Sequence, residues 1–206
     1  MKKIMLFSSA AVVIGLITTG FKLTVNPELE IGTAMPNAEL KMMDVSGKEV
    51  SLNDAKAENG LLVIFSCNTC PYVKLSESRI KEMGTFTKQN KVGMIVINSN
   101  EAQRSEEDSY EAMKSYAKAQ GYAWSYVVDK NSNLANAFGA TRTPHCFLFD
   151  KAGKLVYRGA IDDNIKEPND AKEHYLKDAV VAIATGKSVK TNSTKSVGCS
   201  IKRIEE

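Results

Sequence analysis

The chain has 206 residues, of which 43% are hydrophobic and 25% are charged, and this composition is typical of one globular domain with extensions. The formal net charge is only +3, and Lys2 and Lys3 supply two of these charges. A surface that binds nucleic acid needs a stronger basic excess, so no nucleic-acid partner is expected.

Residues 1–20 have the pattern of an export signal. Lys2 and Lys3 precede an apolar stretch at residues 4–17, which ends in small residues. The alternative is an uncleaved membrane anchor through residues 4–17, because this stretch is near the lower length of a span, ~17 residues. Both alternatives place the protein in the cell envelope, periplasmic or secreted, where disulfides persist.

The first expected elements are a hairpin, a buried strand and a helix. Apolar residues alternate on both sides of a turn within residues 38–52, which predicts a β-hairpin. Residues 61–65 are all apolar, as in a strand that is covered on both faces. A helix is expected from residue 71 onward, bent or ended by Gly84.

The pattern then alternates between strands and helices. Residues 92–97 predict a second buried strand, and residues 105–108 resemble the capping box of a helix that ends at Gly121. Residues 124–128 predict a third strand, followed by a short helix over residues 134–138. Such alternation favours parallel strands joined by crossover helices.

The last part of the domain contains a second hairpin and a final helix. Residues 145–149 and 155–158 flank a glycine-containing turn, and residues 175–183 have helical periodicity. The fold class is therefore α/β, with a central mixed sheet that has helices on both faces and an antiparallel edge. The expected domain covers residues 30–186, and residues 187–206 form a polar tail.

Cys67 and Cys70 lie between the predicted strand at residues 61–65 and the helix that follows. Open α/β sheets place their sites at this end of a parallel strand. Unpaired N–H groups and the positive end of the helix dipole favour a thiolate there, expected at Cys67, and Cys70 can resolve a mixed disulfide. A static bridge would close a loop too short to add much stability, so the spacing favours redox catalysis by this pair.

Thr143 and Pro144 precede the buried strand at residues 145–149. Proline cannot donate to a sheet ladder, and an X-Pro bond can be cis. A cis bond would turn the backbone of Thr143 toward the cysteine loop, where it could pair with an incoming peptide as an added strand. Thr143 and Pro144 are therefore candidate substrate-binding residues.

The other two cysteines allow several interpretations. Cys146 is either a small buried hydrophobic residue or a partner of Cys199. Cys199 is a resolving thiol for the first pair, a structural partner of Cys146, or free. His145 could complete a metal site with Cys67 and Cys70, but neighbours in a strand point to opposite faces, so no metal site is expected.

These features together resemble the thioredoxin superfamily, and the first hairpin resembles its peroxiredoxin-like branch (redoxin, AhpC/TSA-type). The closest resemblance is to the PRX-like group of thioredoxin family proteins, over about residues 30–203. It rests on the segments CNTCPYVK at residues 67–74, TP at 143–144, FLFD at 147–150 and SVGCSIK at 196–202. The resemblance implies a thioredoxin-like fold and a thiol-disulfide oxidoreductase without a cofactor. Its partners would be protein thiols or disulfides, or peroxide.

The sequence departs from the family pattern at several positions. Ile64 occupies the place where true peroxiredoxins carry a threonine or serine that positions peroxide, so a thiol peroxidase is the second hypothesis. Leu61 replaces the buried acid of thioredoxins, and Arg142 stands where the PRX-like group has a cysteine. A Sco-like metal-binding protein is the third hypothesis.

Overall fold

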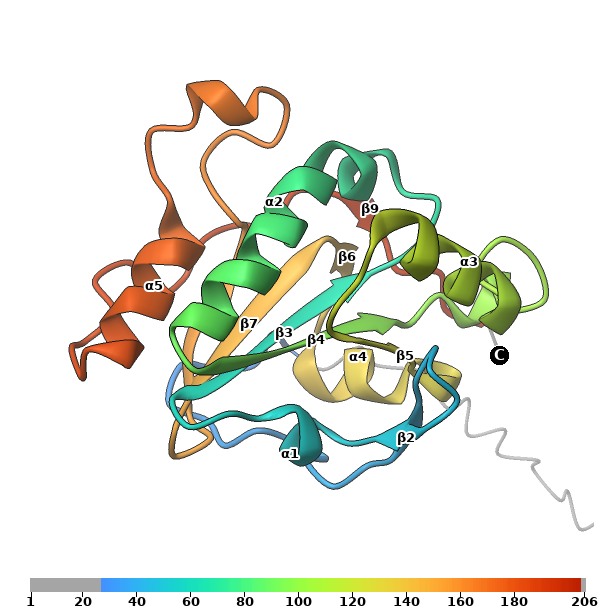
Figure 1. The fold of residues 1–206 in the computed structure, drawn as a ribbon, viewed down its shortest axis with the longest axis horizontal. Helices are drawn as coiled ribbons and strands as arrows, with labels where there is room; N and C mark the ends of the chain where they lie inside the picture. The colour runs from blue at the N-terminus through green and yellow to red at the C-terminus, as the bar shows by residue number, and fades with distance from the viewer. Residues whose placement is uncertain (1–26, 205–206) are drawn as a thin grey trace, which may run out of the picture.

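The computed structural model describes residues 27–204, so the predicted export signal lies outside the described residues. A five-stranded sheet with the order β5-β4-β3-β7-β8 forms its centre (Figure 1). Strands β3, β4 and β5 run parallel, and β7 and β8 are antiparallel to their neighbours, as the alternation predicts. The strands are β3 (Gly60–Ser66), β4 (Val92–Asn98), β5 (Ser125–Val128), β7 (His145–Asp150) and β8 (Leu155–Gly159).

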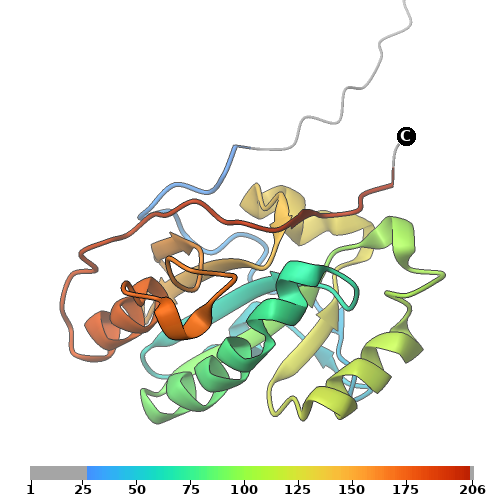
Figure 2. The same cartoon turned by 90° about the horizontal axis from the view of Figure 1, so that it is seen from above.

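Helices cover both faces of this sheet (Figure 2). Side chains alternate along β3: Leu62 packs in the cluster of α2, α3 and α5, while Leu61 packs in the cluster of α1 and α4. This double cover explains why every residue of β3 is buried. The helices are α1 (Leu52–Ala55), α2 (Pro71–Gln89), α3 (Tyr110–Gln120), α4 (Asn133–Phe138) and α5 (Tyr175–Ala184).

Smaller elements connect these layers. A two-stranded hairpin lies next to α1, and a second pair of short strands lies at the carboxyl edge of β3. The short strands are β1 (Met42–Met43), β2 (Glu49–Val50), β6 (Arg142–Thr143) and β9 (Cys199–Ser200). The 3-10 turns are η1 (Glu101–Gln103), η2 (Lys130–Ser132) and η3 (Pro168–Asp170).

The first hairpin is present but shorter than the predicted span of residues 38–52. Leu52 begins α1 instead of continuing a strand, because Ser51 and Asp54 form a capping box. The Ser51 side chain accepts from the Asp54 N–H, and the Asp54 carboxylate accepts from the Ser51 N–H. The sequence prediction missed this helix, although Ser51 and Asp54 have the spacing of a capping box.

The structure contradicts an end of α2 at Gly84 and a start of α3 at residue 105. Helix α2 continues through Gly84 to Gln89, and Gly84 serves close packing, since an added Cβ would lie 2.0 Å from the Trp124 ring. Helix α3 begins after Ser109 rather than at Ser105, because the Ser109 hydroxyl accepts from the Ala112 N–H. The residues between 105 and 109 take part in the candidate site instead.

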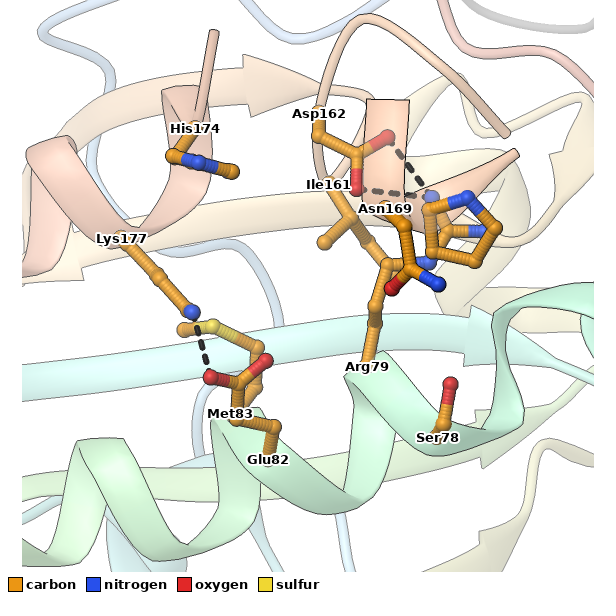
Figure 3. A pocket seen from close by; sticks show the side chains of 10 residues that line it. Ser78, Arg79, Glu82, Met83, Ile161, Asp162, Asn169, His174 and Lys177 are labelled. Atoms are coloured by element: carbon orange, nitrogen blue, oxygen red, sulfur yellow. Dashed lines mark hydrogen bonds and ion pairs between the residues drawn. The ribbon is translucent and has the colours of Figure 1, made fainter. Parts of the chain in front are cut away.

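A buried ion pair fastens α2 to the segment that follows β8. Nη1 of Arg79 lies 2.7 Å from each carboxylate oxygen of Asp162, and both side chains are buried (Figure 3). A cavity of about 180 Å³ lies beside this pair, between α2 and α5. The pair links the segment after β8 to α2, the helix whose N-cap is Cys70.

The predicted polar tail lies along the domain. The Thr194 N–H donates to the Arg158 carbonyl at 3.0 Å, so the tail follows the edge strand β8. Further on, Ile201 is buried in the same apolar cluster as α4. Within residues 27–204, no helix has the length and apolar character to cross a membrane.

Candidate active site

Cys67 and Cys70 lie at the carboxyl end of β3, at the entrance to α2. Strand β3 ends at Ser66 and α2 begins at Pro71, so Cys70 is the N-cap of the helix. Both thiols are nearly buried, with 2% and 3% of their residue surfaces exposed. The structure therefore brings the two predicted catalytic residues to the position that the sequence indicates.

Thr143 contacts both sulfur atoms. Its hydroxyl oxygen lies 3.5 Å from the Cys67 sulfur, and its carbonyl oxygen accepts from the Cys70 thiol at 3.2 Å. The Thr143-Pro144 bond is cis, and the expected approach of Thr143 to the cysteine loop is confirmed. A substrate-binding role for Thr143 and Pro144 stays a prediction.

The two thiols influence the ionisation of each other. Hydrogen bonding with Cys70, together with burial, raises the pKa of Cys67. The same hydrogen bond lowers the pKa of Cys70, against the opposing effect of burial. When one of the two thiols has lost its proton, the remaining proton is shared in the hydrogen bond between the sulfurs. The pair therefore loses its first proton readily and its second with difficulty.

The more acidic sulfur is thus Cys70, whereas the sequence places the easily formed thiolate at Cys67. The physical reason is the start of α2, because Cys70 occupies the N-cap. After Cys67 and Cys199, the Val73 N–H in the first helical turn also contributes to the lowered pKa of Cys70. Cys67 precedes the cap and receives only the Cys70 N–H from the helix entrance.

A network of buried polar side chains hydrogen-bonds to Asn68, the residue that follows Cys67. One oxygen of Asp108 accepts from the Asn68 N–H at 2.8 Å and from the Asn98 amide at 2.7 Å. The Tyr126 hydroxyl donates to the Asn68 side chain at 2.9 Å. The charge of Asp108 also contributes to the raised pKa of Cys67. The sequence pattern assigns Asp108 to a helix start, and only the spatial contact with Asn68 reveals its place in the site.

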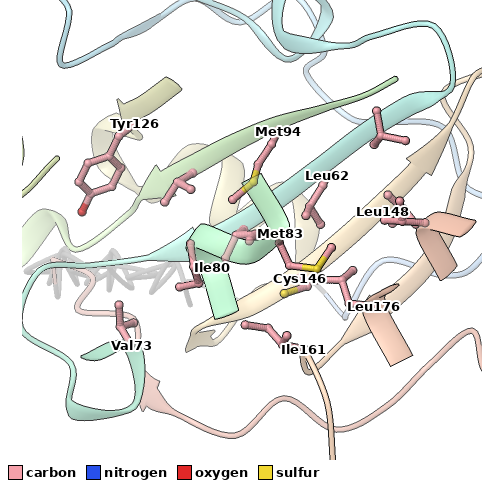
Figure 4. Packing of buried hydrophobic residues seen from close by; sticks show 14 of the residues in the cluster. Leu62, Val73, Ile80, Met83, Met94, Tyr126, Cys146, Leu148, Ile161 and Leu176 are labelled. Atoms are coloured by element: carbon pink, nitrogen blue, oxygen red, sulfur yellow. The ribbon is translucent and has the colours of Figure 1, made fainter. Parts of the chain in front are cut away.

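Cys146 lies apart from this site, in the apolar core between the sheet and α2 (Figure 4). Burial raises the pKa of its thiol. All four cysteines of the chain are free thiols in the structure, so the considered bond between Cys146 and Cys199 is absent. Of the two interpretations of Cys146, the small buried hydrophobic residue fits its surroundings.

His145 faces the opposite side of β7. Its Nε2 atom lies 2.8 Å from a carboxylate oxygen of Glu28, and its ring packs on Phe147. Among residues 27–204, no three histidine, cysteine or acidic side chains are grouped as metal ligands. The considered metal site of His145 with Cys67 and Cys70 is therefore not assembled.

Cys199 lies beside Cys70, although 129 residues separate them in the sequence. Cys199 pairs with Thr143 across the β6–β9 ladder, and hydrogen bonding from Cys199 contributes to the lowered pKa of Cys70. The carboxyl edge of β3 thus holds three thiols. Sequence reasoning considered this approach of Cys199 as one of three alternatives.

Comparisons with known proteins agree with this geometry. A family model described as Redoxin matches residues 30–175. The thiol-disulfide oxidoreductase ResA of Bacillus thuringiensis (strain Al Hakam) is 27% identical over 156 residues, which cover 73% of this chain and 79% of ResA. An uncharacterized conserved protein from Geobacillus kaustophilus is 32% identical, with a TM-score of 0.79 over 86% of this chain and 94% of that protein. Peroxidoxin BcpB from Mycobacterium tuberculosis has a TM-score of 0.59 at 11% identity, over 77% of this chain and 98% of BcpB, and so shows the fold alone.

Proposed function

This chain belongs to the redoxin family of the thioredoxin superfamily, and from this premise we propose that it is a thiol-disulfide oxidoreductase that acts through Cys67 and Cys70. The observation that carries the proposal is the pair of hydrogen-bonded thiols at the carboxyl end of β3, both in contact with Thr143. The similarity to ResA supports the same reaction class.

In the proposed reaction, the reduced pair meets a substrate disulfide. The proton that the pair retains must first pass from Cys67 to Cys70, because Cys70 is the more acidic sulfur. The Cys67 sulfur then attacks, so a bond to the substrate forms and one substrate sulfur leaves as a thiolate. Cys70 then loses its proton and attacks Cys67, which forms the Cys67–Cys70 disulfide and releases the second substrate sulfur. Two electrons pass from the pair to the substrate, and the reverse sequence oxidises a dithiol. The sulfurs supply every electron, so the exchange needs no cofactor.

The proposed substrates are protein thiols or disulfides. Strand β6 offers the backbone of Thr143 next to both sulfurs, and an extended peptide can bind such an edge as an added strand. In the structure β9 pairs with this edge, so the peptide would take the place of β9. A peptide paired with Thr143 would place its own disulfide near Cys67.

The experiment is turnover of a peptide disulfide by the full chain with a dithiol reductant. We expect Cys67→Ser and Cys70→Ser each to lose at least about a hundredfold in rate, because each removes a sulfur from the exchange. Cys146→Ala is the matched control, since that thiol is buried in the core, and it should keep the rate. Unchanged turnover in Cys67→Ser would refute the proposed mechanism.

Peroxide is the alternative oxidant that the family resemblance suggests. Ile64 lies in the apolar cluster three residues before Cys67, and it has no hydroxyl to position peroxide. We therefore expect peroxide consumption no faster than that of a free thiol. A clearly faster rate that depends on Cys67 would instead favour a thiol peroxidase.

We also propose that the protein works outside the cytoplasm. The support is the sequence of residues 1–20, with Lys2 and Lys3 before the apolar stretch at residues 4–17. The test is to isolate the protein from cell fractions and to determine the first residue of its mature form. Export predicts recovery from the envelope or the medium, either cleaved or anchored through residues 4–17, whereas recovery from the cytoplasm would contradict it.

A further inference from the structure

The C-terminal segment occupies the edge of β6 that the proposed function assigns to the substrate. Thr143 pairs with Cys199 and Arg142 with Ser200 in an antiparallel ladder. The ladder continues beyond the two strands, because the Ile201 N–H donates to the Thr141 carbonyl at 3.0 Å. The segment thus has the geometry of a peptide added to the sheet.

The fit of this segment depends on Gly198. A Cβ atom at Gly198 would lie 2.0 Å from the Thr143 carbonyl oxygen, so no side chain is compatible with the docked position. The Gly198 carbonyl accepts from the Arg142 guanidinium at 2.9 Å. Ile201 is buried in the apolar cluster that also contains α4. The segment therefore binds to β6 through specific steric, polar and apolar contacts.

Docking also closes a cavity next to the site. A cavity of about 250 Å³ lies beside Pro144, and Thr194 and Val197 of the C-terminal segment form one of its walls. Ile161 and Tyr175 contribute apolar lining on the opposite side. When the segment leaves, this cavity becomes an open groove next to Thr143 in which a substrate side chain can bind.

The docked segment carries Cys199, whose thiol lies near Cys67 and Cys70. The Cys70 thiol donates to the Thr143 carbonyl at 3.2 Å, and Thr143 pairs with Cys199, so the ladder places the third thiol next to Cys70. Burial and the neighbouring Cys70 raise the pKa of the Cys199 thiol, and the Tyr72 N–H and the charge of Lys202 oppose this shift. Cys199 therefore lies next to Cys70, and its attack on Cys70 in the Cys67–Cys70 disulfide would release Cys67 as the leaving group.

We propose that Cys199 is a third redox residue, carried on an internal strand that takes the place of the substrate. Starting from the Cys67–Cys70 disulfide, the Cys199 sulfur attacks Cys70. The Cys70–Cys199 bond forms, the Cys67–Cys70 bond breaks, and Cys67 leaves as a thiolate that takes up the proton of Cys199. The number of disulfides does not change, so this exchange needs no further oxidant.

This exchange would control access to the site. In the Cys70–Cys199 form, the segment is covalently held on β6, and a peptide cannot pair with Thr143. In the fully reduced form, which the structure shows with the segment docked, only non-covalent contacts hold the segment, so a substrate peptide can displace it. The inference rests on the proposed function, because the Cys67–Cys70 disulfide must form before Cys199 can attack it.

The test is to map disulfides by mass spectrometry after rapid alkylation of the oxidised full chain. We expect two species, with bonds Cys67–Cys70 and Cys70–Cys199. In Gly198→Ala, the added methyl group should displace the segment, so the second species should fall by about tenfold while the first remains. Ser200→Ala is the matched control on the same strand, because Ser200 is exposed, and it should retain both species.

A second measurement separates this inference from the proposed function. In Cys67→Ser, oxidised glutathione should produce one internal bond, Cys70–Cys199, whereas the double variant with Gly198→Ala should accumulate Cys70 bound to glutathione. If the wild type shows only Cys67–Cys70 and Cys67→Ser shows only glutathione adducts, the inference fails and the dithiol mechanism stands. If the wild type forms no Cys67–Cys70 bond and reduces no peptide disulfide, the proposed function itself fails.

Discussion

Cys70 and Cys146 are almost equally buried, at 3% and 1% exposure, yet they lie in opposite chemical environments. The Cys70 sulfur receives hydrogen bonds from Cys67, Cys199 and the first turn of α2, which lower its pKa. No such donor lowers the pKa of Cys146, which burial and, to a smaller extent, the charge of Asp162 raise. The comparison shows that hydrogen-bond donors, rather than exposure, separate a reactive thiol from an inert one in this protein.

The difference between the two cysteine environments can be tested directly by measuring the reactivity of each thiol. In the reduced native protein at neutral pH, iodoacetamide should modify the Cys67–Cys70 pair faster than Cys146 by on the order of a thousandfold, since Cys146 is both protonated and enclosed. Peptide mapping after timed quenching gives each rate, and a denatured sample supplies the reference. Similar native rates would contradict the comparison.

The second prediction concerns stability. Cys146→Ser buries a hydroxyl group among apolar side chains and should lower the free energy of unfolding by about 1–3 kcal/mol. Cys70→Ser should be less costly, because the Thr143 carbonyl can accept from the new hydroxyl. Urea denaturation of the reduced proteins measures both changes. A larger loss in Cys70→Ser would reverse the assignment of structural and reactive cysteines.

The third prediction tests the contact of Thr143 with the pair. Thr143→Val removes the hydroxyl next to the Cys67 sulfur and should slow disulfide turnover by about fivefold, as expected for one hydrogen bond of about 1 kcal/mol. Thr141→Val, at an exposed position of the same segment, is the matched control. Equal rates for the two variants would remove Thr143 from the reaction.

The smallest expected effect is a pH dependence of stability. The folded-state pKa of Cys146 is raised, so above the unfolded-state pKa of about 8.5 the unfolded chain loses a proton that the folded chain keeps. The stability contributed by the neutral thiol is full below this pH and declines by about 1 kcal/mol between pH 8.5 and 9.5. Urea titrations should show a weaker decline in Cys146→Ala. A decline of equal size in that variant would assign the effect to other groups.

The sequence predicts most of the fold because its signals are local. The apolar run at residues 61–65 and the cysteine spacing locate β3 and the entrance to α2, and both are confirmed. The local sequence around Gly84 does not show whether this glycine ends the helix or leaves space for the Trp124 ring inside it. Only the position of a side chain 40 residues further along the sequence distinguishes the two cases.

The candidate site is less predictable because its contacts are long-range. The segment at residues 105–108 carries an acceptable capping pattern, yet Asp108 accepts from Asn68, and no local pattern contains this pairing. Cys199 approaches Cys70 through a ladder with β6, which depends on the space that Gly198 leaves. Residue types in the sequence nominated the cysteines, but the structure was needed to define their neighbours.

The contact between Gly84 and Trp124 also gives the protein an intrinsic optical probe. Trp124 is the single tryptophan of the chain, and its indole packs on Gly84 within α2, the helix whose N-cap is Cys70. Any displacement of α2 changes the surroundings of this one fluorophore. Emission spectra of the unlabelled protein can therefore follow, in real time, whether reduction and oxidation of the cysteines are transmitted along the helix.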